Sequence, residues 1–93
     1  MDTEQAKTLI QQLANQGCIG FSNHCSKRMA ERSVTADDFL NVLIWGQVQS
    51  VEKNQNSGHW KCEVSGRDIE GDRLTLQVAI DRVQNRVICI TVF

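Results

Sequence analysis

The hydrophobic pattern of this chain changes its period near residue 47, and this change constrains the fold more than any other feature. Before residue 47, apolar residues recur three and four positions apart, as on one face of a helix. After it, apolar and polar residues alternate, as in half-buried strands. Helices at about 4–45 followed by strands at about 47–93 predict a single α+β domain over residues 1–93.

The first helix is predicted at about 4–16. Thr3 precedes an acidic first turn and suits the N-cap, and Gly17 suits the position just past the C-terminus. Residues 18–21 are interpreted as a short connector that buries a few apolar side chains.

Two further helices are predicted from their caps. Ser22 is a good N-cap for a helix at about 23–32. Thr35 begins the next helix, with Asp38 in the position of a capping box, and Gly46 ends it. We expect two to three helices to pack on one face of the sheet.

The second half predicts a four-stranded antiparallel meander. Its strands are expected at about 48–53, 60–65, 74–80 and 87–93. The last is apolar on both faces, as a central strand would be.

Charge and hydropathy exclude several classes of protein. The net charge is −1, with four basic and five acidic residues in 1–46 and six of each in 47–93. This balance argues against a protein that binds nucleic acid mainly through bulk charge. No apolar run is long enough to span a membrane, and no signal-peptide pattern is present, so a cytoplasmic location is expected.

In that reducing compartment we expect the four cysteines to be small buried residues and not disulfides. They are Cys18, Cys25, Cys62 and Cys89.

The second predicted helix carries the most suggestive side chains. At roughly 100° per residue, Cys25 and Met29 share the face that should meet the sheet. Arg32 falls within this face, with Arg28 and His24 at its edge. We therefore expect the arginines to point toward or beside the core.

Two interpretations of these arginines remain open. In the structural one, they pair with carboxylates, because an unpaired buried guanidinium is costly. The available acids are Asp38, Glu63, Asp68 and Asp81. In the functional one, His24, Arg28 and Arg32 line an anion site between the helix and the sheet.

A second histidine, His59, lies in a turn two residues before Lys61. It suits proton transfer or phosphate contact, although an exposed turn histidine without a role is the more common case. The His59-x-x-Cys62 spacing resembles a metal site, but Cys62 alternates as a core residue does, and we expect no metal and no cofactor. Lys61 and Arg67 lie on or just after the polar side of the predicted strand. They are interpreted either as part of a solvated face or as phosphate ligands.

The motif Phe21-Ser-x-His24-x-x-x-Arg28-Met29-x-Glu31-Arg32, with the closing strand Val87–Phe93, resembles a family of small bacterial proteins with an SxHxxxRMxER motif. That family is similar in layout to the RelE/barnase-like ribonuclease toxins. The resemblance implies a toxin of the toxin–antitoxin type, a metal-independent endoribonuclease, with an antitoxin partner and RNA or the ribosome as target.

From the resemblance and the residue chemistry together we predict six site residues. The catalytic ones are His24, Arg28 and His59, and those that bind phosphate are Arg32, Lys61 and Arg67. A nearly neutral chain without tyrosine also fits a different class, a non-catalytic protein-interaction module whose arginines are structural. Both classes, enzyme and interaction module, stay open from the sequence.

Overall fold

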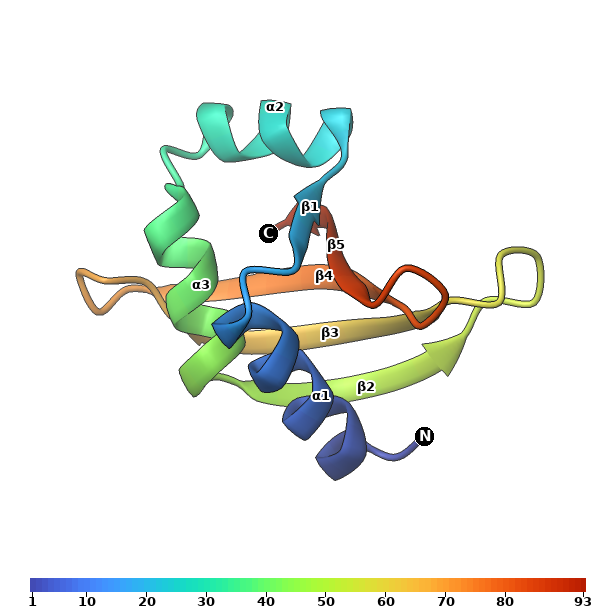
Figure 1. Cartoon of the computed structure of the whole chain (residues 1–93). Coiled ribbons are helices and arrows are strands. Elements are labelled where there is room, and N and C mark those ends of the chain that lie inside the picture. The colour runs from blue at the N-terminus through green and yellow to red at the C-terminus, as the bar shows by residue number, and fades with distance from the viewer.

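The computed structural model describes residues 1–93 and consists of three helices and one five-stranded sheet (Figure 1). The elements are α1 (Thr3–Asn15), β1 (Ile19–Phe21), α2 (Asn23–Glu31), α3 (Ala36–Trp45), β2 (Gln47–Lys53), β3 (Trp60–Arg67), β4 (Arg73–Asp81) and β5 (Arg86–Val92). The strand order is β1-β5-β4-β3-β2. The α+β class, with helices preceding a meander, is as predicted. None of the helices is long and apolar enough to cross a membrane.

The prediction of a four-stranded antiparallel sheet is wrong, because β1 adds a fifth, parallel strand beside β5. Ile19 pairs with Val87, and Phe21 pairs with Cys89. Three residues are too few to show a period of two, and their pairing partner lies at the other end of the chain. The segment interpreted as a connector is therefore part of the sheet.

The helix caps follow the local sequence. The Ser22 side chain accepts a hydrogen bond from the N–H of Cys25, and Thr35 and Asp38 form a reciprocal capping box. The first helix begins earlier than predicted, because Asp2 and not Thr3 is its N-cap and accepts from the N–H of Gln5.

The core lies between the helices and one face of the sheet. The central strand β4 contributes alternate apolar residues, namely Leu74, Leu76, Val78 and Ile80. Helix α3 packs on β3 and β4, α1 packs on β2 and α3, and α2 packs on β5. Helix α2 buries only Cys25 and Met29, whereas α3 buries its whole inward face.

A disulfide joins Cys25 of α2 to Cys89 of β5, so the expectation of four unbridged cysteines is wrong for this pair. The two Cα atoms lie 6.0 Å apart although 64 positions separate the residues. No cysteine spacing in the sequence indicates this pairing, which requires α2 to lie over β5. Cys18 and Cys62 are free thiols, as expected.

Candidate functional site at the end of strand β4

The six predicted site residues lie in three separate places. His24, Arg28 and Arg32 belong to α2 and its C-cap. His59 immediately precedes β3, Lys61 lies near its start, and Arg67 ends it. At ~3.3 Å per residue, Lys61 and Arg67 are roughly 20 Å apart along the strand. His59 and Lys61 are near neighbours in the sequence, but the structure does not gather the six residues into one site.

The α2 residues face solvent. His24 and Arg28 line a shallow hollow of about 210 Å³ together with Lys27 and Glu31. The Arg28 guanidinium pairs with the Glu31 carboxylate across one helical turn at 3.6 Å. Such surface pairs contribute at most about 1 kcal/mol to stability.

The expectation that Arg32 points into the core is wrong. Arg32 is exposed and makes no ion pair. Helix α2 packs chiefly on β5, and its buried face ends at Met29. Arg32, at the C-cap, therefore lies beyond the part of the helix that the sheet covers.

Two of the predicted phosphate ligands have local neighbours. Lys61 is half-buried opposite Glu52 of β2 and lines a hollow of about 240 Å³ in the β2–β3 region. Arg67 donates a hydrogen bond to the carbonyl oxygen of Gly71 at 2.9 Å and so braces the β3–β4 loop. This hydrogen bond gives the Arg67 side chain a structural role that requires no bound ligand.

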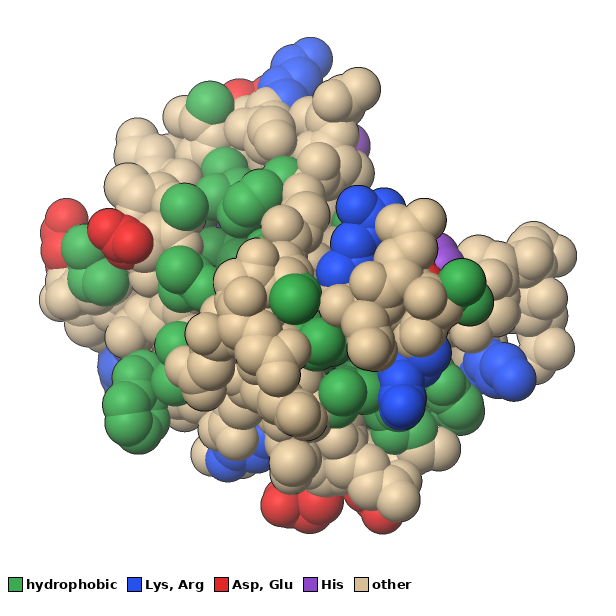
Figure 2. Space-filling view, in the orientation of Figure 1, with side chains coloured by type: hydrophobic (Ala, Val, Ile, Leu, Met, Phe, Trp, Pro, Cys, Tyr) green, Lys and Arg blue, Asp and Glu red, His purple; other side chains and the backbone are tan.

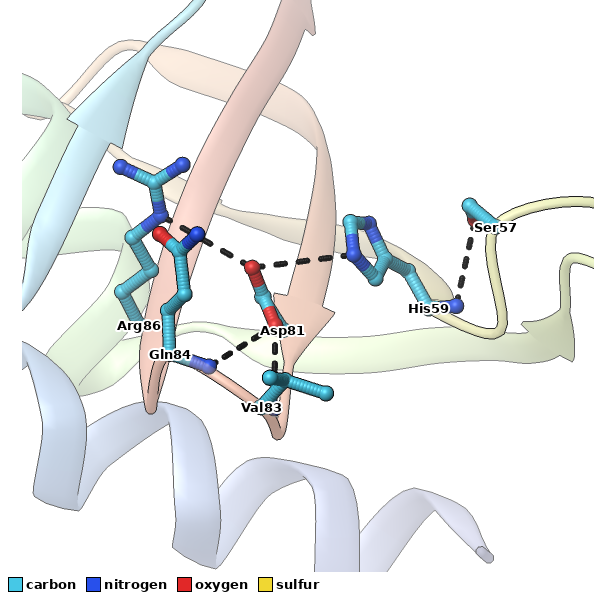
Figure 3. Close-up of polar contacts among 6 residues, drawn as sticks. All are labelled: Ser57, His59, Asp81, Val83, Gln84 and Arg86. Carbon is cyan, nitrogen blue, oxygen red and sulfur yellow. Dashed lines mark hydrogen bonds and ion pairs between the residues drawn. The ribbon is translucent and has the colours of Figure 1, made fainter.

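A group of polar side chains meets where β4 ends (Figure 3). The Nε2 atom of His59 lies 3.7 Å from Oδ2 of Asp81, and the Nε atom of Arg86 lies 3.9 Å from the same oxygen. The imidazole and the guanidinium approach the carboxylate from opposite sides. Asp81 is 4% exposed, whereas the side chains of His59 and Arg86 are 32% and 44% exposed.

Strand register and turn geometry hold this group in place. Asp81 pairs with Arg86 across the β4–β5 hairpin. Its Oδ1 accepts hydrogen bonds from the backbone N–H groups of Val83 and Gln84 at 3.0 and 3.1 Å. On the other side, the backbone N–H of His59 donates to the Ser57 hydroxyl at 3.2 Å. The carboxylate is thus fixed by the turn that follows it.

The environment keeps Asp81 ionised. The backbone N–H of Gln84 lowers the pKa of the carboxyl most, and the charges of His59 and Arg86 and the N–H of Val83 lower it further. Burial acts in the opposite direction but does not prevail. The buried carboxylate of Asp81 therefore has two partly exposed partners, the imidazole of His59 and the guanidinium of Arg86.

This arrangement is suited to proton transfer beside an anion. The carboxylate lies beside Nε2 of the imidazole, which leaves Nδ1 for another molecule. The exposed part of the Arg86 guanidinium is available to a phosphate oxygen.

Sequence reasoning found His59 but missed two of its neighbours. It considered Asp81 only as a partner for the α2 arginines, and it did not single out Arg86. One signal was present, since Asp81 is a charged residue at the end of an otherwise alternating apolar strand. Its proximity to His59 depends on the register of β3 against β4, which the sequence does not display.

No three His, Cys, Asp or Glu side chains are arranged to hold a metal ion. The residue three positions after His59, Cys62, is 1% exposed in the core. Burial raises the pKa of its thiol to about 11. His59 and Cys62 therefore do not act together despite their spacing.

Three helices on one face of a mixed sheet, with a polar cluster at a hairpin, define a small α+β domain. Residues 21–93 match the family described as Domain of unknown function (DUF4258), and the chain belongs to this family. Helix α1 precedes the matched range. No match was found among curated proteins.

Proposed function

We propose that the protein is a metal-independent endoribonuclease whose site is the group His59, Asp81 and Arg86. The observation that carries this proposal is the shared Oδ2 atom of Asp81, which lies 3.7 Å from His59 and 3.9 Å from Arg86. Both partners remain partly exposed, so the imidazole and the guanidinium are each accessible to a substrate.

The chemistry follows from the groups. In RNA the 2′-hydroxyl attacks the adjacent phosphorus and the bond to the 5′-oxygen breaks, which leaves a 2′,3′-cyclic phosphate. His59 takes the 2′-hydroxyl proton through Nδ1, and Asp81 stabilises the resulting imidazolium. Arg86 binds a non-bridging oxygen, where charge develops in the transition state. The leaving 5′-oxygen takes a proton from water.

The remaining predicted residues have smaller parts in this proposal. Lys61 is two residues from His59 in the sequence and adds a positive charge to the same strand region. His24, Arg28 and Arg32 lie on α2 and take no part in the step. A toxin role, an antitoxin partner and the ribosome as target are predictions from the resemblance alone.

A labelled single-stranded RNA tests the proposal, with the all-deoxy oligonucleotide of the same sequence as control and a chelator present throughout. We expect cleavage of the RNA only, with cyclic phosphate ends. His59→Ala should reduce the rate by about 100-fold or more. Arg86→Gln should also reduce it, while Arg73→Gln, at the exposed start of β4, should not.

Two results would count against the site. If the purified chain leaves the RNA intact, the proposed activity is lost. If His24→Ala abolishes cleavage and His59→Ala does not, the chemistry belongs to α2.

A second candidate function, protein interaction, is favoured by one observation. An apolar hollow of about 290 Å³ is lined by residues of β1, α2, the α2–α3 connection and α3, namely Phe21, Ser26, Met29, Ala30, Val34 and Ala36. Figure 2 shows apolar side chains gathered on this face, between the positions of α2 and α3 in Figure 1. The Phe21 ring is partly exposed and packs edge-on against Phe39. An intact RNA substrate in the experiment above would favour this function.

A further inference from the structure

We infer that the Cys25–Cys89 disulfide is a redox-sensitive latch that holds helix α2 on the sheet, and that a dithiol reductant releases the helix while the sheet stays folded. The inference does not depend on the proposed nuclease, because no residue of α2 belongs to the group around Asp81.

Helix α2 is weakly attached apart from this bond. It has nine residues, fewer than an isolated helix needs to be stable in water. Only Cys25 and Met29 are buried, and the rest of the helix is mostly charged or polar. Its principal packing partner is β5. One of its two anchoring side chains is thus the disulfide itself.

The sheet does not depend on the bond in the same way. Cys89 pairs in register with Phe21 of β1 on one side and with Val78 of β4 on the other. These backbone ladders continue whether or not Cys89 is oxidised. Free cysteine is also a well-tolerated small apolar residue in a core. Reduction therefore removes a tether from α2 and leaves β5 in place.

The exchange reaction balances with a dithiol as reductant. One thiolate attacks a sulfur of the pair, the S–S bond breaks, and the released cysteine thiolate takes a proton. The second thiol of the reductant then resolves the mixed disulfide. Two electrons and two protons pass to the cysteines, and the reductant leaves as a disulfide. Cys25 and Cys89 are both 0% exposed, so the attack requires a local opening that exposes one of the two sulfur atoms.

Release of α2 changes the surface on one face. Met29 and Ala30 of α2 form part of the apolar hollow, with Phe21 and Val34 beside them. When the helix lifts, Phe21 and Cys89 lose their cover. The oxidised and reduced forms thus present different apolar surfaces.

Trypsin tests the latch, because Lys27, Arg28 and Arg32 are cleavage sites on α2 and its C-cap. The natural chain is digested briefly with and without dithiothreitol, and the fragments are quantified by mass spectrometry. We expect reduction to speed cleavage at these sites at least ten-fold. Cleavage at Lys61 and Arg73, in the sheet, should speed up less than cleavage on α2 and should remain slower than it. Removal of the reductant with mild oxidation should restore the slow rate.

Variants separate the latch from other thiol effects. The double variant Cys25→Ser, Cys89→Ser should be cut rapidly at α2 with or without dithiothreitol, and Cys18→Ser should respond to the reductant as the natural chain does. Equal acceleration at α2 and sheet sites would overturn the inference, since it would report global unfolding. Alkylation of four thiols in the oxidised protein before any reduction would overturn it as well.

Discussion

The carboxylate of Asp38 ties the start of α3 to the β3–β4 loop by accepting a hydrogen bond from the backbone N–H of Ile69 at 3.0 Å. Its other oxygen accepts from the N–H of Thr35 at 2.9 Å and so completes the capping box. Asp38 is 7% exposed, and these two backbone N–H groups lower its pKa. One side chain thus joins a local helix signal to a contact 31 positions away.

Asp38→Ala should lower the free energy of unfolding by about 2 kcal/mol, because it removes a cap and leaves the N–H of Ile69 without a partner. Denaturant unfolding measures this difference. Asp37→Ala is the matched control, since Asp37 is an exposed neighbour in the same helical turn and should cost about 0.5 kcal/mol. Equal losses in the two variants would contradict the proposed role of Asp38.

Acid should destabilise the fold through Asp38 and Asp81. Each has a folded-state pKa below its ordinary value of 3.8. The unfolded chain therefore binds protons first as pH falls. The stability that these groups contribute is complete above the unfolded-state pKa and is lost as pH falls through the folded-state value. Unfolding measured between about pH 5 and pH 2 should show this loss. Replacing both residues by Asn should flatten the slope, and an unchanged slope would show that other groups control it.

Features set by neighbouring residues could be predicted from the sequence. The caps Ser22 and Thr35 each act on the N–H three positions ahead, so their signal is complete within four residues. The alternation of apolar and polar residues in β4 could likewise be predicted from neighbouring positions. By contrast, β1 is a strand only because it pairs with β5, at the opposite end of the chain.

The candidate site was harder to predict for the same reason. His59, Asp81 and Arg86 come from three segments, and only strand register brings them together. Arg32 shows a different failure, because helical phase assigned it to the face of Cys25 and Met29 but could not show where the cover of the sheet ends. Phase gives the direction of a side chain and not what lies in that direction.

Loss of the disulfide should cost the fold about 4 kcal/mol, as expected for a cross-link closing a loop of this length. The 64-position separation of Cys25 and Cys89 is the basis of this estimate. Cys25→Ser with Cys89→Ser should therefore show a lower denaturant midpoint than the oxidised natural chain. Reduced natural chain should resemble the variant. If reduction leaves the midpoint unchanged, the bond contributes little to stability.

Asp81→Asn should separate the chemical role of this carboxylate from its structural one. The amide oxygen can still accept the hydrogen bonds that Val83 and Gln84 donate to Oδ1, so the hairpin should keep its shape. The negative charge beside His59 disappears, so the imidazolium that forms in the proposed step loses its neighbouring anion. We expect RNA cleavage to fall by about 100-fold. In a His59→Ala background the same substitution should have little further effect, because the two residues would act as one unit. Independent, multiplying losses would place the role of Asp81 in the hairpin alone.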